Sequence, residues 1–425
     1  MFIKFITDAI RYSLVGFEND FKFRKINPRK FKIPKIKESS LYIHIPFCKS
    51  MCFYCPYNKV KYSPKLIAPY VQSLLKEIGL YAQKLGKIKI SSIYIGGGTP
   101  TNITDELGVV LEKIKKEFNV NGDIAVETTV ADINEYTVKK LKSYDVNLIS
   151  LGVQSFSDKY LKMLGRNYNS EEIIPAIQML QSIGFDTINI DLMFCLPFQT
   201  EEEIVDELKK AIKLGVDQIT LYPLFTFPYS SIGEYKKIKN IKMPNIFIRR
   251  KFYRLIHEFL LKNGFNRVSV WGFQKTKKQK YSSVTRRHYI GLGAGAGSSF
   301  LNKFYFNTFS IDAYNKRLSK NFLPIAVSMN VSKMLSDYYW LYWKFYETSF
   351  RKKELKQSFG SYWKVIFLIK LLKLLNFCTF SKNEIKLTER GSFWIHLIQN
   401  YFVLNYIDKV WSIMKKKDFP NIIKI

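Results

Sequence analysis

Strand-like and helix-like segments alternate along the chain from Leu41 to about Pro228. The strand candidates are short and rich in Ile, Val and Leu, and a longer segment with helical periodicity follows each of them. The strand candidates are residues 41–46, 91–96, 123–128, 147–152, 186–192 and 217–222, and the helix candidates are residues 66–84, 104–118, 134–143, 158–164, 170–183 and 200–214. This alternation predicts a parallel sheet, because a helical crossover must return the chain before each new strand. The expected fold is α/β, a partial (β/α)6 barrel with its functional groups at the carboxyl ends of the strands.

Three cysteines follow the first strand candidate. Cys48, Cys52 and Cys55 have the spacing C-x3-C-x2-C within YIHIPFCKSMCFYCPYNK, and the whole chain has five cysteines. Thiolates this close together are suited to zinc or to an iron–sulfur cluster, and a cluster held by three cysteines leaves one iron open for a further ligand. Zinc favours four protein ligands, so a zinc site here would need a distant residue. Packed free cysteines are the other alternative, while an odd number of cysteines disfavours a disulfide framework.

Glycines and a carboxylate follow the second and third strand candidates. Residues 94–101, YIGGGTPT, contain Gly97, Gly98 and Thr99. Successive glycines let backbone N–H groups approach a ligand closely, because no Cβ intervenes, but they also make tight structural turns. Glu127, in IAVETT, is a charged residue in an apolar segment and must be paired or hydrogen-bonded. It is therefore either a ligand contact or one half of a structural ion pair.

Further polar residues occur near the ends of the next two strand candidates and after the first helix candidate between them. Gln154, in ISLGVQSF, carries an amide that can both donate and accept hydrogen bonds. Arg166, in LGRNY, has a guanidinium fork that matches a carboxylate. Asp191, in INIDLMFCLPFQT, can accept hydrogen bonds from ribose hydroxyls at a strand end. Any one of these residues alone is more often a surface or core residue, so the prediction depends on their common order and spacing.

Taken together, these motifs resemble the radical S-adenosylmethionine (SAM) superfamily. YIHIPFC, LGVQSF, LGR and INIDL-x3-LP-x-QT resemble in particular its coproporphyrinogen III oxidase-like branch, over roughly residues 41–400. The resemblance implies a radical SAM barrel with a [4Fe-4S] cluster on Cys48, Cys52 and Cys55, whose open iron binds the amine and carboxylate of SAM. An electron donor such as flavodoxin or ferredoxin would reduce the cluster, and SAM cleavage would yield a 5′-deoxyadenosyl radical that abstracts hydrogen from an organic substrate.

The same resemblance implies which residues contact SAM. Gly97, Gly98 and Thr99 match its GGGTPT motif, which binds the methionyl amine. The remaining residues that the resemblance implies as SAM contacts are Glu127, Gln154, Arg166 and Asp191, with Tyr42 expected beside the cluster.

The chain departs from the branch at several positions. Tyr168 stands where the family commonly has a histidine, and Cys195 and Phe198 stand where it has glycines. Oxygen-independent coproporphyrinogen III dehydrogenases carry a further cysteine where this chain has Tyr57. This last difference argues against assigning the haem-pathway decarboxylation by default. We interpret Cys195 as a packed core thiol rather than a ligand.

Three functions stay open for the chain. One is oxidoreductase chemistry on a porphyrinogen-like substrate, and another is a methyltransferase or cyclopropane-forming enzyme that uses two SAM molecules. A second glycine-rich segment, IGLGAGAGSSF over residues 290–300, could approach a substrate or a second SAM, or could be a structural turn. The third function is a haem-binding chaperone, whose histidine would have to be one of His44, His257, His288 and His396.

Composition divides the chain into parts. We expect a basic N-terminal arm over residues 1–40, the barrel core over residues 41–230, a barrel-flanking region over residues 231–330 and a C-terminal helical domain over residues 331–425. A short amphipathic helix near the start, an extended arm over residues 21–37, a helix near residues 246–263 and an exposed basic loop over residues 274–287 are further predictions. The C-terminal helices, near residues 331–348, 361–375 and 391–402, are expected to cover the barrel mouth as a lid.

The chain is strongly basic, with a formal net charge of +32. Such a charge is compatible with nucleic acid or an anionic membrane, but the basic residues are mostly lysine and are spread along the chain, which disfavours nucleic acid. A positive field could also attract an anionic small-molecule substrate. The most apolar run is interrupted by Lys364, Lys370 and Lys373, so no transmembrane segment is expected. We find no signal peptide, and clustered free cysteines favour a reducing, cytoplasmic location.

Overall fold

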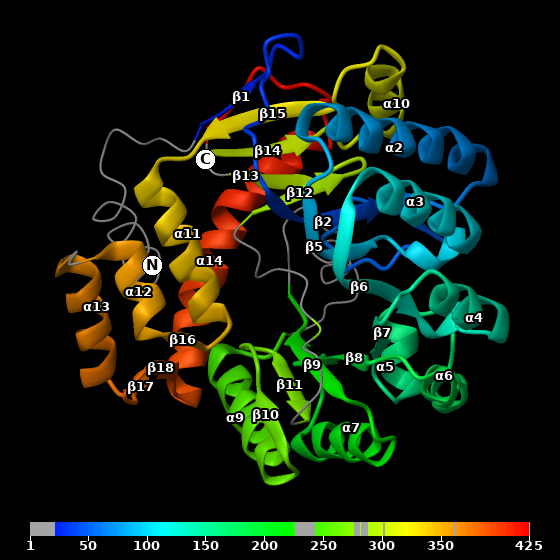
Figure 1. The fold of residues 1–425 in the computed structure, drawn as a ribbon. Coiled ribbons are helices and arrows are strands. Elements are labelled where there is room, and N and C mark those ends of the chain that lie inside the picture. The colour runs from blue at the N-terminus through cyan, green and yellow to red at the C-terminus, as the bar shows by residue number, and fades with distance from the viewer. Residues whose placement is uncertain are drawn as a thin grey trace.

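Parallel strands form the centre of the protein (Figure 1). The computed structural model describes residues 22–225, 243–275, 281, 288–300, 302–360 and 363–424, without the side chains of residues 402 and 404–407. The central strands are β2 (Glu38–Ile45), β5 (Lys89–Gly97), β6 (Asn119–Thr129), β7 (Leu148–Gln154), β8 (Thr187–Phe194) and β9 (Gln218–Pro223). They pair in this order and in parallel, as the sequence predicted.

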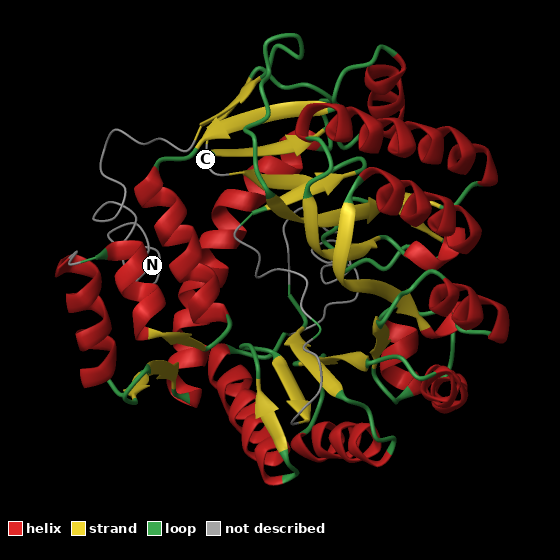
Figure 2. Cartoon of the chain, viewed as in Figure 1, coloured by secondary structure: helices red, strands yellow, loops and turns green. Residues whose placement is uncertain are grey.

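Helices cover the outer face of these strands (Figure 2). They are α2 (Pro64–Leu85), α3 (Thr104–Glu117), α4 (Glu135–Ser143), α5 (Asp158–Met163), α6 (Ser170–Ile183) and α7 (Glu201–Lys213). Every residue of β7 is buried, as expected for a parallel strand with one face on helices and the other toward the barrel interior. Capping boxes of Asn169 with Glu172 and of Thr200 with Glu203 begin α6 and α7. The predicted succession of strands and helices is confirmed.

The central strands do not close into a barrel, and the sheet continues at both ends. Antiparallel strands β11 (Gly272–Lys275) and β10 (Phe265–Arg267) follow β9. The strands that extend the sheet beyond β2 are β12 (Tyr289–Leu292), β13 (Gly297–Phe300), β14 (Lys303–Asn307), β15 (Ile325–Asn330), β1 (Lys22–Lys25) and β19 (Ile422–Lys424). Most of this extension was not predicted, because its strands are short and interrupted by glycine and lysine. The extended arm was predicted, but its pairing as β1 between β15 and β19 was not.

The C-terminal region combines helices with a small sheet. Its helices are α11 (Lys333–Tyr346), α12 (Lys352–Phe359), α13 (Trp363–Leu374) and α14 (Glu389–Met414). The short strands β16 (Ser349–Arg351), β18 (Glu384–Leu387) and β17 (Cys378–Phe380) form an antiparallel sheet that was not predicted. The helix predicted near residues 246–263 is α9 (Ile246–Lys262), while α10 (Ile311–Ser319) was not predicted. No helix in the described ranges has the length and apolar character that crossing a membrane requires.

The N-terminal amphipathic helix lies outside the described residues, and so does most of the predicted basic loop. One short pair of strands does bear on the site: β3 (Phe47–Cys48) pairs in parallel with β4 (Val60–Lys61) and so fixes both ends of the cysteine loop.

Candidate functional site

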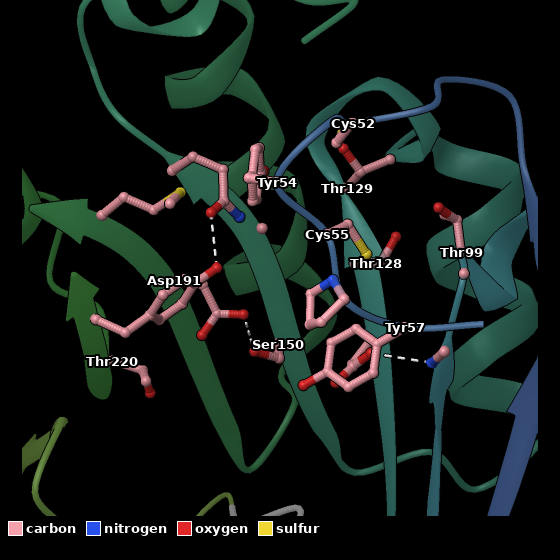
Figure 3. A pocket seen from close by; sticks show the side chains of 18 of the residues that line it. Cys52, Tyr54, Cys55, Tyr57, Thr99, Thr128, Thr129, Ser150, Asp191 and Thr220 are labelled. Carbon is pink, nitrogen blue, oxygen red and sulfur yellow. Dashed lines mark hydrogen bonds between the residues drawn. The ribbon is translucent and has the colours of Figure 1, made fainter. Parts of the chain in front are cut away.

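A cavity of about 420 Å³ lies at the carboxyl ends of the parallel strands. The predicted site residues that line it are Cys48, Cys52, Cys55, Gly97, Gly98, Thr99, Glu127, Gln154, Arg166 and Asp191. Figure 3 shows Cys55, Thr99 and Thr128 on one side of the cavity, with Asp191 on the other. Tyr42 is the exception, since it does not line the cavity and its hydroxyl bonds to His44 Nδ1 at 2.7 Å. The fold therefore brings together residues that are up to 143 positions apart in the sequence.

The cysteine loop is held at both ends by backbone hydrogen bonds. Val60 N donates to Pro46 O at 2.8 Å, and Tyr62 N donates to Cys48 O at 2.8 Å. Inside the loop, the Lys59 ammonium group donates to the carbonyl oxygen of Cys52. Burial raises the pKa of the Cys48 thiol to about 11. The loop thus fixes three thiols on the cavity wall without a disulfide, since all the cysteines are free.

The thiol arrangement fits a cluster better than a single metal ion. Among the described residues, no group of three His, Cys, Asp or Glu side chains is placed to hold one ion. A cubane cluster needs no such convergence, because each cysteine binds a different iron. The other two cysteines, Cys195 and Cys378, are buried away from the cavity, so Cys195 is the packed thiol that was predicted.

The glycine turn after β5 packs directly on the strand that leads to the cysteines. Gly98 N donates to Ile45 O at 2.7 Å, and Thr99 N donates to Phe47 O at 2.9 Å. A Cβ on Gly98 would lie 2.7 Å from Phe47 O, so only glycine allows this approach. The N–H groups of Gly97, Gly98 and Thr99 therefore already have partners within the protein, as in the structural turn that was one of the two interpretations. No hydrogen bond among described residues ends on Gly98 O, which leaves an acceptor suited to an ammonium group.

Glu127 lies beside the glycine turn. Its carboxylate accepts a hydrogen bond from Tyr94 OH and one from Gly97 N at 3.3 Å. Tyr94 OH in turn accepts from Tyr281 OH at 2.8 Å. Burial raises the pKa of Glu127 to about 7, although the bond from Tyr94 offsets part of the shift. No described cation forms an ion pair with Glu127, so the structural ion pair considered for it is absent from that part of the chain.

Gln154 and Arg166 lie on the next section of the wall. The backbone of Gln154 has a left-handed φ of 68°, and its Oε1 accepts from Tyr222 OH at 2.8 Å. Strained residues of this kind concentrate at functional sites. The Arg166 guanidinium lies over the rings of Tyr54 and Tyr168, and its buried Nε has no hydrogen-bond partner among described residues. An unpaired buried donor at a cavity wall indicates a place for a ligand oxygen.

Asp191 completes the predicted set. Its Oδ2 accepts from Ser150 Oγ at 3.0 Å, and its Oδ1 accepts from Asn189 Nδ2 at 2.9 Å. Burial raises the pKa of Asp191 to about 6, and these two hydrogen bonds offset part of the shift. The carboxylate therefore keeps a fixed orientation within β8, three residues before the strand ends at Phe194. Tyr168 also has a defined role, because its hydroxyl donates to Gly152 O at 2.7 Å and supports the bend before Gln154.

Several lining residues were missed by sequence analysis. Tyr222 lies one residue before the end of β9, in register with Met193 of β8, and its place near a strand end could have identified it. Tyr346 and His396 reach the cavity from α11 and α14, and no sequence pattern marks them. His396 Nε2 accepts from Trp271 Nε1 at 3.1 Å, and Nδ1 bonds to Gln399 Oε1 at 3.2 Å. Burial lowers the pKa of His396 to about 4, so this histidine is neutral.

The second glycine-rich segment does not line this cavity. Gly293 N donates to Glu77 Oε2 at 2.8 Å, and Gly295 N donates to Thr308 O at 2.8 Å. A Cβ on Gly293 would lie 2.5 Å from His44 O and from Tyr70 OH. The turn therefore has the structural role that was one of its two interpretations.

Comparisons with known proteins agree with this geometry. The family model described as "Radical SAM superfamily" matches residues 42–222. Heme chaperone HemW of Lactococcus lactis is 30% identical over 286 residues, which are 66% of this chain and 74% of that protein. Heme chaperone HemW of Haemophilus influenzae is 31% identical over 297 residues, 67% of this chain and 75% of that protein. Oxygen-independent coproporphyrinogen III oxidase of Cereibacter sphaeroides is 27% identical over 307 residues, 67% of each chain.

A solved structure shows the same fold over nearly the whole chain. The coproporphyrinogen III oxidase HemN of Escherichia coli, described as a radical SAM enzyme, has a TM-score of 0.76 and 20% identity. The match covers 92% of this chain and 98% of that one. A match of this length extends well beyond the barrel strands.

Proposed function

Because this chain belongs to the radical SAM superfamily, in the family of heme chaperone HemW and oxygen-independent coproporphyrinogen III oxidase, we propose that it cleaves SAM reductively at a [4Fe-4S] cluster. The observation that carries the proposal is the shared cavity. A loop of three cysteines, a glycine turn and four polar side chains, those of Glu127, Gln154, Arg166 and Asp191, all line it. When bound, the cluster and SAM would supply a one-electron cleavage that yields the 5′-deoxyadenosyl radical.

We assign the chain's own residues to the two ends of SAM. Cys48, Cys52 and Cys55 would hold the cluster. Gly98 O and the Glu127 carboxylate are acceptors for the methionyl amine, while the unpaired Nε of Arg166 is a donor for the methionyl carboxylate.

The ribose end of SAM is assigned to the far wall of the cavity. Asp191 would accept hydrogen bonds from the ribose hydroxyls. The Gln154 amide nitrogen donates to no described residue, and it would donate to the same sugar or to the carboxylate. Each of these side chains is already oriented by a neighbour, so binding would require little rearrangement.

The substrate is proposed to bind where the C-terminal helices meet the cavity. Trp271, Tyr346 and His396 provide an aromatic wall there, and Lys59 and Arg166 provide positive charge toward the cysteine loop. An organic substrate that is flat and carries carboxylates, such as a tetrapyrrole, suits this combination. The helices would also shield the radical from water, which is the role expected of the predicted lid.

A haem-binding chaperone is the second candidate, because relatives with that name match this chain. Within the described residues, His44 and His396 use both ring nitrogens in hydrogen bonds, to Tyr42 and Asn58 and to Trp271 and Gln399. Haem ligation by either would have to break one of these bonds. A third candidate, chemistry with two SAM molecules, loses its support, since the second glycine turn is packed away from the cavity.

One experiment separates these functions. The protein is reconstituted anaerobically with iron and sulfide, reduced with dithionite, and given SAM, and 5′-deoxyadenosine is quantified. We expect product from the native protein and from Cys378→Ser, and none from Cys52→Ser. A formed cluster that yields no 5′-deoxyadenosine, together with stoichiometric haem binding in an absorbance titration, would replace the enzyme proposal with the chaperone. S-Adenosylhomocysteine among the products would revive methyl transfer.

A further inference from the structure

Helix α13 has two apolar faces, and the described residues cover only one of them. The covered face packs in the core of the C-terminal region and consists of Val365, Ile369 and Leu372. On the opposite face, Trp363, Phe367 and Leu374 are 67%, 62% and 79% exposed. At 3.6 residues per turn these three side chains fall within an arc of about 40°. Surface helices normally carry polar residues there, so this exposed strip requires an explanation.

Lysines border the exposed strip on both sides. Lys364 and Lys373 project about 80–100° from its centre in opposite directions, and Lys370 lies about 20° outside the arc, on the side of Lys373. None of the three forms an ion pair with a described residue, and α13 contains no acidic residue. The basic character extends to the neighbouring segments, since residues 351–386 contain nine Lys or Arg and two Glu.

We propose that α13 docks the protein on an anionic lipid surface. A helix that lies in a membrane interface buries an apolar strip among the acyl chains while flanking lysines reach the headgroups, and this is the arrangement of α13. Its 12 residues span about 18 Å, too short to cross a bilayer. The helix therefore lies along the surface. The charge of the flanking residues selects anionic lipids rather than neutral ones.

The position of α13 in the fold permits such contact. It lies at the outer edge of the C-terminal region, with α11 and α14 between it and the barrel strands (Figure 1). Docking there leaves the cysteine loop and the SAM-binding wall untouched, so the proposal is independent of the function proposed above.

The test is partitioning of the full-length protein into vesicles. Phosphatidylcholine vesicles with and without phosphatidylglycerol are sedimented with the protein at low salt, and the bound fraction is measured. We expect binding to the anionic vesicles only, and its loss at 0.5 M salt (about 0.5 M suffices because the Debye length then falls below about 5 Å). Each lysine near an anionic membrane surface raises the partition coefficient about fivefold. The triple variant Lys364→Gln/Lys370→Gln/Lys373→Gln should therefore lower that coefficient on the order of a hundredfold.

Apolar variants provide the matched comparison. Trp363→Ser/Phe367→Ser/Leu374→Ser should abolish partitioning, whereas Val109→Ser/Ile174→Ser, which removes exposed apolar side chains from α3 and α6, should not change it. Because all five positions are at least 46% exposed, both variants should keep the native unfolding transition. Brominated lipid should quench Trp363 fluorescence, measured as the difference between the protein and Trp363→Phe.

Three results would overturn the proposal. The first is no binding to anionic vesicles, or equal binding to neutral ones. The second is a native dimer that the triple Ser variant converts to a monomer without vesicles, because the strip would then be an interface between copies. The third is shielding of Trp363 from a soluble quencher in the absence of lipid, which would mean that another segment of this chain covers the strip.

Discussion

Two glycine-rich turns in this protein each lie against a buried glutamate, but only one of these two turns lines the cavity. In the first, Gly97 N donates to Glu127, and the turn lines the cavity. In the second, Gly293 N donates to Glu77, which also accepts hydrogen bonds from Asn307 and Tyr314. Burial raises the pKa of both glutamates to about 7. The two turns are chemically alike, but Glu77 is fully enclosed whereas Glu127 is reached from the cavity.

The comparison shows that a glycine-rich segment indicates close packing but does not by itself indicate a ligand site. Both turns press on the same strand, since a Cβ on Gly97 would meet the His44 ring and a Cβ on Gly293 would meet His44 O. Glycine is required in each case for close approach of protein to protein. A ligand site arises only where the neighbouring glutamate retains an accessible face. The glycines alone therefore could not distinguish a binding turn from a structural one.

The largest expected effect comes from adding a methyl group to each turn. In Gly98→Ala the Cβ would meet the backbone of Ile45 to Phe47 at 2.7–2.9 Å and displace the strand end that leads to Cys48. We expect SAM cleavage to fall about a hundredfold or more, as for an error of about 1 Å in a catalytic site. Formation of 5′-deoxyadenosine by the reconstituted protein measures this.

Gly293→Ala is the matched variant on the enclosed turn. Its φ of 100° and the contacts at 2.5 Å should destabilise the fold by about 4 kcal/mol, as judged by denaturant unfolding. The folded fraction should keep its SAM cleavage rate. If Gly98→Ala and Gly293→Ala lose the same fraction of the SAM cleavage rate, the two turns do not differ in function.

Exchanging each glutamate for its amide gives the next largest effect. Glu127→Gln removes the charge proposed to hold the methionyl amine, so SAM cleavage should fall about tenfold to a hundredfold. Glu77→Gln replaces an oxygen that accepts a hydrogen bond with an NH2 group, which should cost about 1–3 kcal/mol of unfolding free energy. Glu127→Gln should therefore lower the rate of SAM cleavage more than the stability, and Glu77→Gln should lower the stability more than the rate; kinetic assays and denaturant unfolding of both variants measure this. A slower Glu77→Gln enzyme with unchanged stability would contradict the comparison.

The enclosed glutamate also predicts a pH dependence of stability. The pKa of Glu77 is about 7 in the folded protein against 4.5 for an unburied glutamate. Between these values the unfolded chain has released a proton that the folded chain retains, so stability falls as the pH rises through this window and levels off above it. The contribution amounts to at most about 3 kcal/mol. The unfolding free energy should change less between pH 4.5 and pH 7 in Glu77→Gln than in the native protein. If the two proteins show the same change with pH, the raised pKa of Glu77 is not the cause.

The smallest expected effect is on stability, at an exposed position where a left-handed backbone favours glycine. Phe198 has a left-handed φ of 62° and is 76% exposed, at a position where the resembled family has glycine. Phe198→Gly should therefore be more stable than Phe198→Ala by about 0.5–1 kcal/mol, because only glycine adopts this φ without strain. Thermal unfolding of the two variants measures the difference. Equal stabilities would mean that the bend tolerates any side chain.

The sequence predicted those parts whose signal is local. Strand–helix alternation gave the order of the parallel strands, and the order of motifs gave the cavity residues from Cys48 to Asp191. The sheet extension was missed, because strands such as Tyr289–Leu292 are only four residues long and take their structure from pairing with β2. Tyr346 and His396 were missed because their place at the cavity depends on how the C-terminal helices pack. Cys195 and Phe198 were noted as departures, and their left-handed backbone explains why glycine is the usual choice there.

The extended sheet also bears on how the protein avoids self-association. An open sheet offers unpaired backbone groups at its two outer strands, and such edges can recruit strands from other molecules. Here the described sheet ends in β10 and β19, which are three residues long each. Arg267 and Lys424 stand at the ends of these short strands, so a second chain would gain few hydrogen bonds and would meet positive charge. The incomplete barrel can thus stay open without becoming a template for aggregation.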